Sequence, residues 1–553
     1  MEAEQMMMVV KITFSVISTG FLALLFHLYN VLVLKPKRHI SHLQNQGIRG
    51  PPPSFMVGNI PEIKRIRQEN HQSAPPAQQQ SQSQSRSNFA AVIAHDWFSN
   101  VFPHLQRSNF DAIIAHDWPS NVFPHLQKWR DTYGPVFVYS SGNIQFLCIS
   151  DIELVKEISL YTSLNLGKPS YLSKDRGPLL GQGILTSSGQ IWSHQRNIIA
   201  PQFYLDKVKK MVHLMVEATI STLKSWESRI ESQGGGVADI KIDDDLRSLS
   251  GDVISRACFG SSYCKGEEIF SNLRTLQKTM SKGYIGIPGS RYMPTKNNRE
   301  IWKLEKEIDS MILEVVNQRI EQGSQDKDLL QMIVEGAESY GISSNLISRD
   351  KFIVDNCKNI YFAGHETTAI TASWCLMLLS AYPEWQDRVR AEVLEICKQG
   401  FPDANMLRRM KTLTMVIQET LRLYPPAVFV IRQALEDIKF KDIVIPGGMN
   451  VQIPIPALQQ NTDLWGSDAH IFNPERFSNG INGACKFPQA YIPFGTGSRT
   501  CLGQNFAMIE LKVILSLILS KFSFSLSPAY YHMPAFRLVV EPDHGVCLQI
   551  RKL

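Results

Sequence analysis

The feature that most constrains this 553-residue chain is a segment of twenty-three residues without formal charge, Ile12 to Leu34. A stretch of that length can span a bilayer, because a transmembrane helix needs about 20 apolar residues. Lys35, Lys37 and Arg38 follow it at once, and such a positive flank stays on the cytosolic side. No small-residue cleavage site follows the segment, which favours a retained anchor over a cleaved signal peptide. We therefore predict a single-pass anchor over residues 1–34, with a luminal N-terminus and a cytosolic body.

Residues 35–130 are expected to connect this anchor to the body. The prolines of 47–54 (GIRGPPPS) favour a stiff, extended spacer, and the low-complexity run 70–86 cannot repay the entropy of ordering. A 21-residue tandem repeat follows, with copies at 86–106 and 107–127 that differ at three positions. Two copies are too few for a solenoid. Only the second copy continues into KWRDTYGPVFVY, so we expect that copy in the fold and interpret the first as an insertion, from a local duplication or a gene-model error.

Composition excludes several classes of protein. Hydrophobic residues make up 44% of the chain and charged residues 20%, which suits a large folded core. A net charge of +6 is too small for this length to indicate nucleic-acid binding. The nine cysteines include no CxxC pair, which fits a reducing compartment and argues against a disulfide scaffold or zinc ribbon. A metal site at Cys485 and Cys501 is not favoured, because no further ligand stands at suitable spacing.

The body, residues 131–553, is predicted to be mainly α with a small β portion. Residues 136–149 carry two strand-like runs around Ser-Ser-Gly-Asn and indicate a β-hairpin. Residues 150–425 are mostly helix-patterned, with a glycine-rich break at 233–236. Short strands are expected again within 438–456. Together these elements indicate one large domain.

Ten residues near the C-terminus, FGTGSRTCLG at 494–503, combine three glycines with one cysteine directly before a helical run. Glycine lets a backbone turn tightly and approach a flat ligand, because it has no Cβ. Cys501 would then lie at a helix N-terminus, where free N–H groups favour a thiolate. A thiolate held below a flat ligand is what an axial haem ligand requires. The alternative, a small buried cysteine in an ordinary glycine-rich turn, accounts poorly for so dense a pattern.

This stretch resembles the haem-binding signature of the cytochrome P450 superfamily, which it matches at Phe494, Arg499, Cys501 and Gly503. The resemblance implies a P450 fold preceded by the transmembrane helix, with haem b as the cofactor. It implies that Cys501 is the axial ligand of the haem iron. It also implies that Arg499 pairs with a haem propionate.

Two further matches concern contacts to the same haem. Trp192-Ser-His-Gln-Arg196 has the family's WxxxR spacing, which places both side chains on one helical face. The resemblance implies that Trp192 and Arg196 contact one propionate. Arg432, ten residues beyond Arg422, corresponds to another propionate arginine. Each match alone is weak, because Trp and Arg four residues apart are common.

Glu419 and Arg422 form an ExxR pair on a helix that Pro425 and Pro426 should end. Such an i, i+3 pair is ordinarily solvated and worth only ~0.2–0.5 kcal/mol. The P450 family, however, carries an ExxR pair at this distance before its cysteine and completes it with an arginine from a P-E-R-F stretch, here Arg476. By that resemblance we predict a buried triad of Glu419, Arg422 and Arg476 that holds the backbone beneath the haem.

The stretch YFAGHETT, residues 361–368, places small residues, a carboxylate and two hydroxyls inside an apolar helical pattern. These are poor choices for a plain helix, and a threonine that bonds the preceding turn can distort it. The stretch resembles the family's oxygen-activating motif. By that resemblance Glu366 would supply protons, and Thr367 would hold the oxygen intermediate and its water. His365 is expected to face solvent or a neighbour, because the distal position on iron must stay open.

Five motifs in the family's order, between residue 130 and the C-terminus, imply a membrane-anchored haem-thiolate monooxygenase. NADPH would supply electrons through a flavoprotein reductase, and O₂ would give one oxygen atom to a hydrophobic substrate and the other to water. The body would lie on the cytosolic face of the endoplasmic reticulum membrane, in contact with lipid. The reductase is expected to dock on the cysteine side, although a solvated face explains the lysine cluster equally well. The basic residues there are Lys207, Lys209, Lys210, Arg476 and Lys486.

Two stretches, 166–196 and 250–263, are similar to a plant subfamily that oxidises gibberellins, which are carboxylated diterpenoid hormones. Related plant enzymes act on brassinosteroids, cytokinins or triterpenoids, and these substrates are the alternatives. Candidate pocket residues come from the loop before Trp192, from the 361–368 helix and from the segment after the ExxR helix. They are Tyr171, Leu172, Leu180, Phe362, Ala363, Val428, Phe429 and Val430. For each of them, plain core packing is an equally good explanation.

Two other classes of haem protein would also keep Cys501. A haem-thiolate isomerase or dehydratase needs no external O₂, but such enzymes typically lose the Glu366-Thr367 pair. A haem sensor or binding protein gains nothing from Arg196, Glu366 and Thr367 together. A requirement for both NADPH and O₂ in product formation separates a monooxygenase from both classes.

Overall fold

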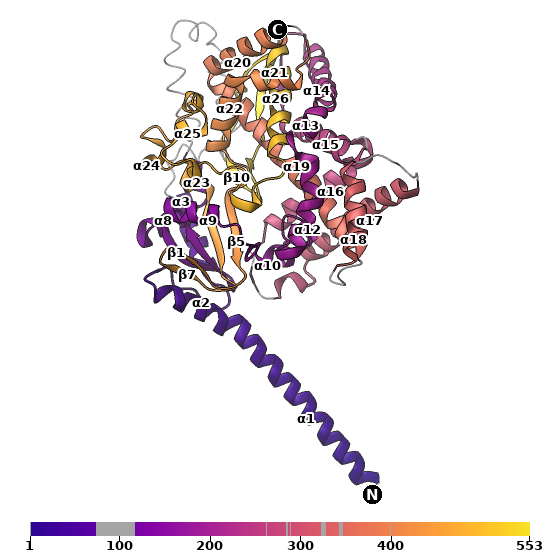
Figure 1. The fold of residues 1–553 in the computed structure, drawn as a ribbon, viewed down its shortest axis with the longest axis vertical. Coiled ribbons are helices and arrows are strands. Elements are labelled where there is room, and N and C mark those ends of the chain that lie inside the picture. Colours follow the sequence, from indigo (N-terminus) through magenta and orange to yellow (C-terminus); the bar gives the residue numbers. More distant parts are fainter. Residues whose placement is uncertain are drawn as a thin grey trace.

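The computed structural model describes residues 2–72, 117–260, 263–283, 286–287, 289–321, 328–341, 347–398 and 400–553. Helices form most of the body, and a small β region lies beside the end where the N-terminal helix joins it (Figure 1). The prediction of a mainly α fold with a small β portion is therefore confirmed.

The body follows the N-terminal helices in the chain. In sequence order, its helices are α3 (Ile60–Gln72), α7 (Trp118–Val122), α8 (Pro124–Tyr133), α9 (Ile152–Leu160), α10 (Ser170–Lys174), α11 (Gly177–Leu180), α12 (Gly189–Ile199), α13 (Leu205–Lys210), α14 (Val212–Ser232), α15 (Asp243–Phe259), α16 (Tyr263–Ser281), α17 (Lys296–Glu321), α18 (Leu329–Gly341), α19 (Arg349–Ala381), α20 (Pro383–Cys397), α21 (Ala404–Arg409), α22 (Lys411–Leu423), α23 (Ile455–Gln459), α24 (Thr462–Trp465), α25 (Ile481–Ala484) and α26 (Gln504–Lys521). The strands are β1 (Val136–Ser141), β2 (Ile144–Ile149), β3 (Leu166–Gly167), β4 (Val237–Lys241), β5 (Phe429–Ala434), β6 (Ile438–Phe440), β7 (Ile443–Ile445), β8 (Asn450–Pro454), β9 (Phe522–Leu526), β10 (Pro534–Phe536), β11 (Val540–Pro542) and β12 (Cys547–Lys552).

The N-terminal helix projects from the body as a single long rod (Figure 1). α1 (Glu2–Tyr29) continues through a π-helical turn, Asn30–Leu34, into α2 (Lys35–Gln44). The stretch Met6–Gln44 is long and apolar enough to cross a membrane, and its apolar side chains, such as Phe14 and Phe26, are exposed. Apolar surface of this extent is unfavourable in water, so a lipid environment suits this helix.

The proline-rich segment 47–54, predicted as a stiff spacer, lies against the sheet. Buried Asn59 donates from its amide to the carbonyl of Pro52 at 3.1 Å and accepts from the backbone N–H of Ser140 on β1 at 2.8 Å. A Cβ at Gly50 would lie 1.8 Å from the carbonyl oxygen of Val138, so this close approach requires glycine. The chain is therefore held on the body directly after α2.

The main sheet has five strands in the order β1-β2-β8-β5-β3. Its first two strands are the predicted hairpin, antiparallel with Val136 opposite Ile149. β2 pairs with β8 in parallel, with Phe146 opposite Asn450, and β8 pairs antiparallel with β5, which carries Arg432. Smaller sheets have the orders β4-β12-β9, β10-β11 and β6-β7. The strands expected within 438–456 are thus present, and the sheet places β8 between the distant β1–β2 hairpin and β5.

α19 is the longest helix, with 33 residues, and most of them are buried. It contacts α15, α18, α22 and α26, and a helix buried on all sides belongs to the core of a large domain. Ser348 caps its N-terminus by accepting from the backbone N–H of Lys351, and Pro383 opens the next helix. The candidate oxygen-activating motif therefore lies in the centre of the body.

The described part of the second repeat copy, 117–127, is packed into the core. Trp118 is 1% exposed, donates to the carbonyl of Leu423 at 2.9 Å and stacks on Tyr424 with ring centroids 6.3 Å apart. α8 runs without a break from Pro124, inside the repeat, to Tyr133. This copy therefore continues directly into the fold. The first copy, 86–106, lies outside the described residues.

Deleting residues 86–106 should leave folding intact, because it shortens a connecting segment whose closure entropy changes by only about 0.6 kcal/mol per doubling of length. Deleting 107–127 instead produces nearly the same chain, with Phe98 in place of Pro119 near the start of α7. We expect both variants to fold and the second to be less stable by up to about 1 kcal/mol, because proline reduces the entropy of the unfolded chain. Circular dichroism during thermal unfolding measures both. Loss of folding in the first variant would show that copy 86–106 is structural.

Candidate active site

Residues 494–503 form a tight turn immediately before α26. The backbone N–H of Cys501 donates to the carbonyl of Phe494 at 2.9 Å. Gly495 and Gly497 have φ values of +73° and +71°, which favour glycine. Gly503 has an ordinary φ of −84°, but a Cβ there would meet no protein atom within 4 Å. The turn therefore places Cys501 and the backbone of Gly503 beside open space.

The environment of the Cys501 thiol suits a metal ligand. Its side chain is exposed, yet the surrounding protein desolvates it and raises the pKa of the thiol. A hydrogen bond from the Gly503 N–H and the positive charge of Arg196 oppose this rise without cancelling it. The protein alone therefore does not favour the thiolate that the helix terminus was expected to stabilise. A coordinated metal ion deprotonates its thiol ligand outright.

Four cationic side chains gather near this turn: Lys168, Arg196, Arg432 and Arg499. The guanidinium carbons of Arg196 and Arg499 lie 5.4 and 4.2 Å from the ring centroid of Trp192. The hydrogen bonds of the three arginines go to backbone carbonyls, and none of the four cations pairs with an acid among the described residues. The predicted propionate contacts are thus brought together, with Lys168 as an additional member.

The lowered pKa values of this cationic cluster show that it is suited to an anionic ligand. Burial and the charges of Arg432 and Arg196 lower the pKa of Arg499 to about 9, and burial lowers the pKa of Arg432 to about 10. Burial, together with the positive charges of Arg432 and Arg499, holds the pKa of Lys168 well below its ordinary value. The buried Nη2 of Arg499 has no hydrogen-bond partner in the described structure. Arginine keeps its proton in proteins, so the cluster is suited to bind carboxylates.

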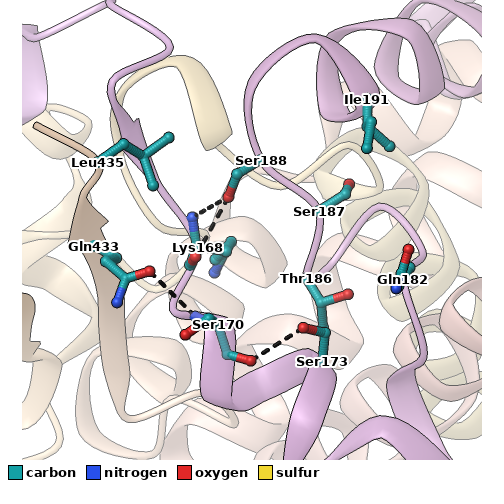
Figure 2. Close-up of a pocket in the computed structure, with 10 residues that line it drawn as sticks. All are labelled: Lys168, Ser170, Ser173, Gln182, Thr186, Ser187, Ser188, Ile191, Gln433 and Leu435. Atoms are coloured by element: carbon teal, nitrogen blue, oxygen red, sulfur yellow. Dashed lines mark hydrogen bonds between the residues drawn. The ribbon is translucent and has the colours of Figure 1, made fainter. Parts of the chain in front are cut away.

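A cavity of about 280 Å³ includes Lys168 of the cationic cluster in its lining, and Figure 2 shows its lining residues. Hydroxyl and amide side chains form most of its wall, and the backbone N–H of Lys168 donates to Ser188 Oγ at 2.7 Å. Ser187 links cavity and cluster, because its carbonyl accepts from Arg499 Nη1 at 2.9 Å. The lining residues are Lys168, Ser170, Ser173, Gln182, Thr186, Ser187, Ser188, Ile191, Gln433 and Leu435.

The three residues of the predicted triad meet in the interior. Glu419 and Arg422 are both 0% exposed and share two hydrogen bonds, of 2.6 and 2.8 Å. Arg476 Nε lies 3.6 Å from Glu419 Oε1, and its terminal nitrogens bind Asp468 at 2.7 and 3.0 Å. Asp468 is thus a fourth member that sequence reasoning missed. The side chain of Arg476 is buried and paired, so its expected place in a docking patch is wrong.

A chain of hydrogen bonds connects the triad to the cysteine turn. Arg422 donates to the carbonyl of Gln459 at 2.9 Å, and the Gln459 amide donates back to the carbonyl of Arg422 at 2.9 Å. The side-chain oxygen of Gln459 accepts from the backbone N–H of Ile492 at 3.1 Å, two residues before Phe494. The buried pair therefore positions the segment that leads into the turn.

The candidate proton donor on α19 is a paired carboxylate. Glu366 is 1% exposed, and its Oε2 accepts from Arg274 Nη1 at 3.1 Å and Arg247 Nε at 3.5 Å. Both arginines also bind Glu541, at 2.9 and 2.5 Å. Burial would raise the pKa of Glu366, but the positive charges of Arg247 and Arg274 outweigh it and lower that pKa. Glu366 is therefore ionised at neutral pH.

The neighbours of Glu366 on α19 lie as follows. Thr367 Oγ1 donates to the carbonyl of Ala363 at 2.7 Å, and the helix continues through this contact. His365 packs against Phe270, with ring centroids 4.9 Å apart, and burial lowers its pKa to about 4. His365 thus faces a neighbouring helix in its neutral form.

The candidate pocket residues divide between two core clusters. Tyr171 and Val428 are buried in the large helical cluster, and Leu172, Leu180, Phe362 and Phe429 pack against it. Ala363 is partly buried on α19. Val430, by contrast, belongs to the cluster around the main sheet. Val430 therefore packs in a different core cluster from the other candidates.

A family model described as Cytochrome P450 matches residues 113–543. The chain belongs to the cytochrome P450 family. It is 50% identical over 533 residues to Cytochrome P450 714C2 of Oryza sativa subsp. japonica, covering 95% of each chain. It is also 45% identical to Cytochrome P450 714B3 of Zea mays, with 99% and 97% covered, and 44% identical to Cytochrome P450 714A2 of Arabidopsis thaliana, with 97% of each covered. The protein is a P450 monooxygenase.

The site fits the haem that the P450 family implies. Cys501 is the ligand that iron would bind, and the open space beside Gly503 accommodates a flat group. The unpartnered Arg499 Nη2 and the uncompensated charges of Arg432 and Lys168 suit two propionates. Sequence reasoning missed Lys168, because this residue belongs to none of the recognised haem motifs. Its only signal in the sequence is that it is a basic residue within the 166–196 stretch.

Replacing Glu419 by glutamine should destabilise this P450 by about 3–5 kcal/mol, because it leaves the buried charge of Arg422 uncompensated. Glu475→Gln is the matched control, since Glu475 pairs with Arg388 at 2.9 Å on the surface and an exposed pair is worth about 0–1 kcal/mol. Denaturant unfolding followed by circular dichroism measures both. Equal stability losses would contradict the structural role of the triad.

Proposed function

We propose that this P450 oxidises gibberellins, the carboxylated diterpenoid hormones, by hydroxylation or epoxidation. The carrying observation is that the two stretches similar to a gibberellin-oxidising subfamily, 166–196 and 250–263, lie at or beside the candidate site. The first contains Lys168, Trp192 and Arg196, and the second lies largely on α15, which packs against α19. Similarity to plant P450s over 95% or more of the chain supports the monooxygenase chemistry on which this proposal builds.

The reaction consumes one molecule of O₂, two electrons from NADPH and two protons, and gives the oxidised substrate and water. Haem, when bound, supplies the oxygen-activating chemistry, which the axial thiolate promotes. The protein contributes the Cys501 ligand, the cations that hold the propionates, and a surrounding wall that keeps side reactions low. Arg196, Arg432, Arg499 and Lys168 gain the anionic partners that they lack in the protein alone.

Proton delivery is assigned to Thr367 and Glu366. The Thr367 hydroxyl bonds the Ala363 carbonyl, so its oxygen can accept a hydrogen bond from a water. Glu366 is ionised and held by Arg247 and Arg274, so it acts by accepting a proton and passing it on rather than by storing one. This arrangement gives Glu366 a relay role.

The electron donor is proposed to be an NADPH-dependent flavoprotein reductase at the endoplasmic reticulum membrane. α13 packs against α26, the helix that follows Cys501, and exposes Lys207 and Lys210. Lys486 is exposed as well. Exposed charges at the edge of an interface mainly raise the rate at which an acidic partner associates. The apolar α1 provides the lipid contact.

The substrate proposal is tested by incubating the membrane-bound enzyme and a reductase with a panel of labelled gibberellins. We expect an oxygenated product, detected by mass spectrometry, only when both NADPH and O₂ are present. Brassinosteroids, cytokinins and triterpenoids serve as competing panels. Product from one of those panels, and none from gibberellins, would overturn the substrate class while leaving the monooxygenase activity intact.

Replacing Thr367 by alanine should uncouple the reaction, so that NADPH oxidation continues while hydrogen peroxide replaces much of the organic product. Positioned proton transfer typically contributes ~10²–10⁴-fold, although a water in the vacated space can recover part of it. Ser380→Ala is the control, because among the described residues Ser380 bonds only its own helix, at Leu376, near the far end of α19. The measurement is product and peroxide formed per NADPH oxidised. An unchanged ratio in Thr367→Ala would remove the role assigned to Thr367.

A further inference from the structure

We propose that three buried polar residues of α19, namely Asp355, Asn356 and Asn359, are positioning residues that fix the loop 181–187 as a rigid wall of the substrate pocket. Their hydrogen bonds to successive backbone groups of the loop form what we call the ladder. By fixing the loop, the ladder would decide which substrate shapes the pocket accepts. The inference rests on the pocket assigned above, but not on gibberellins as the substrate.

The first two rungs of the ladder hold the start of the loop. Asp355 Oδ2 accepts from the backbone N–H of Gln182 at 2.8 Å. Asn356 Oδ1 accepts from the backbone N–H of Ile184 at 3.1 Å. Residues 181–187 belong to no strand in the described structure, so these side chains give hydrogen-bond partners to two backbone N–H groups of the loop.

The third rung makes two bonds with the loop. Asn359 Oδ1 accepts from the backbone N–H of Leu185 at 2.8 Å, and Asn359 Nδ2 donates to the carbonyl of Leu180 at 2.7 Å. Leu180 is one of the candidate pocket residues. The carboxamide therefore fixes both ends of the segment that carries Leu180 and Leu185.

These polar groups are at the centre of an otherwise apolar core. Asp355, Asn356 and Asn359 are 1%, 0% and 0% exposed. A buried polar group is costly unless it is hydrogen-bonded, and apolar residues would fill a core helix more favourably. Their presence is explained by the loop, because each of them binds its backbone.

The loop is shaped to receive the ladder. A Cβ at Gly181, which has a φ of +54°, would lie 2.0 Å from the carboxyl carbon of Asp355. A Cβ at Gly183 would lie 2.5 Å from the carbonyl oxygen of Asp355 and 2.6 Å from Asn359 Oδ1. Only glycine at these two positions lets the loop close on α19.

The ladder is itself held from behind. Lys358, whose side chain is 0% exposed, places its ammonium 3.3 Å from Asp355 Oδ1 and 2.9 Å from Asp309 Oδ1 on α17. Lys351 lies 3.0 Å from Asp355 Oδ2. The Asp355 carboxylate therefore cannot rotate away from the loop without breaking several charged contacts.

The ladder lies on the same face of α19 as the proposed oxygen-activating residues. Asn356, Asn359, Ala363 and Thr367 follow the 3.6-residue period of a helix. With a rise of 1.5 Å per residue, Ala363 stands about 6 Å beyond Asn359 along the axis. The loop is therefore fixed within about two turns of the reaction site.

The opposite side of the loop is tied to the haem-binding cations. Gln195 Nε2 on α12 donates to the carbonyl of Gln182 at 2.9 Å. Arg499 Nη1 donates to the carbonyl of Ser187, a lining residue of the cavity in Figure 2, at 2.9 Å. The loop thus bridges the oxygen helix and the propionate site, which is the form expected of a pre-organised wall.

The first measurement follows amide hydrogen exchange of the peptide covering 181–187 in the haem-loaded enzyme. We expect Asn359→Leu to speed exchange of this peptide by about tenfold, because two hydrogen bonds are lost, with α12 and α19 peptides unchanged. Ser373→Ala is the control, since within the described part of the chain Ser373 on α19 bonds only the carbonyl of Ala369. Gly183→Ala approaches the same contact from the loop side and should give the same pattern.

The second measurement uses two iron-binding probes, imidazole and the bulkier 4-phenylimidazole, titrated by the Soret shift. In Asn359→Leu and Gly183→Ala, the ratio of the two dissociation constants should change several-fold, because only the larger probe depends on the pocket wall. The control should keep the wild-type ratio. Retention of the reduced-CO spectrum verifies that haem and its thiolate ligand are intact.

The outcomes are separable from the substrate proposal. Unchanged exchange would show that the ladder does not hold the loop, and faster exchange with an unchanged probe ratio would show a purely structural role. Either result overturns the inference. If gibberellins are not oxidised by the wild-type enzyme but the probe ratio shifts in both variants, the ladder retains its role and only the substrate class fails.

Discussion

The burial of Glu419 and Arg422 is the constraint on which the arrangement of this P450 depends. Both side chains are fully buried, and such a pair is tolerated only when every remaining donor and acceptor is satisfied. Arg422 meets this condition by bonding backbone carbonyls of a distant segment, which includes Gln459. Gln459 in turn holds Ile492. The hydrogen bonds that satisfy this buried ion pair therefore also hold the segment that leads into the cysteine turn.

The cationic cluster differs from that ion pair in its charge balance. Glu419 and Arg422 balance each other, whereas Lys168, Arg432 and Arg499 repel one another and bond mainly backbone. A protein with such a cluster is least stable without its anionic partner, and binding of that partner contributes to folding. The rigid frame and the anion-dependent cluster meet at residues 494–503. Cofactor retention and fold stability are thus coupled in this enzyme.

Local patterns were sufficient wherever partners lie close in the sequence. The β1–β2 hairpin is specified by two strand-like runs and a four-residue turn, and the end of α22 by Pro425 and Pro426. Partners that lie far apart gave no local signal. Arg247 and Arg274 hold Glu366 across 119 and 92 residues of sequence. Glu366 therefore resembled a free acid in the sequence and is a paired carboxylate in the fold.

The sequence by itself determined the family motifs, the cysteine turn and the long apolar character of the N-terminal helix, because each depends on residues within one turn or one short segment. Tertiary structure alone decided which charges meet. Lys168 joins the arginines, Arg476 is withdrawn from the surface, and Asp355 with Asn359 receives the loop before α12. The physical reason is that desolvation and charge pairing depend on distances in space, and a linear sequence carries no record of those distances.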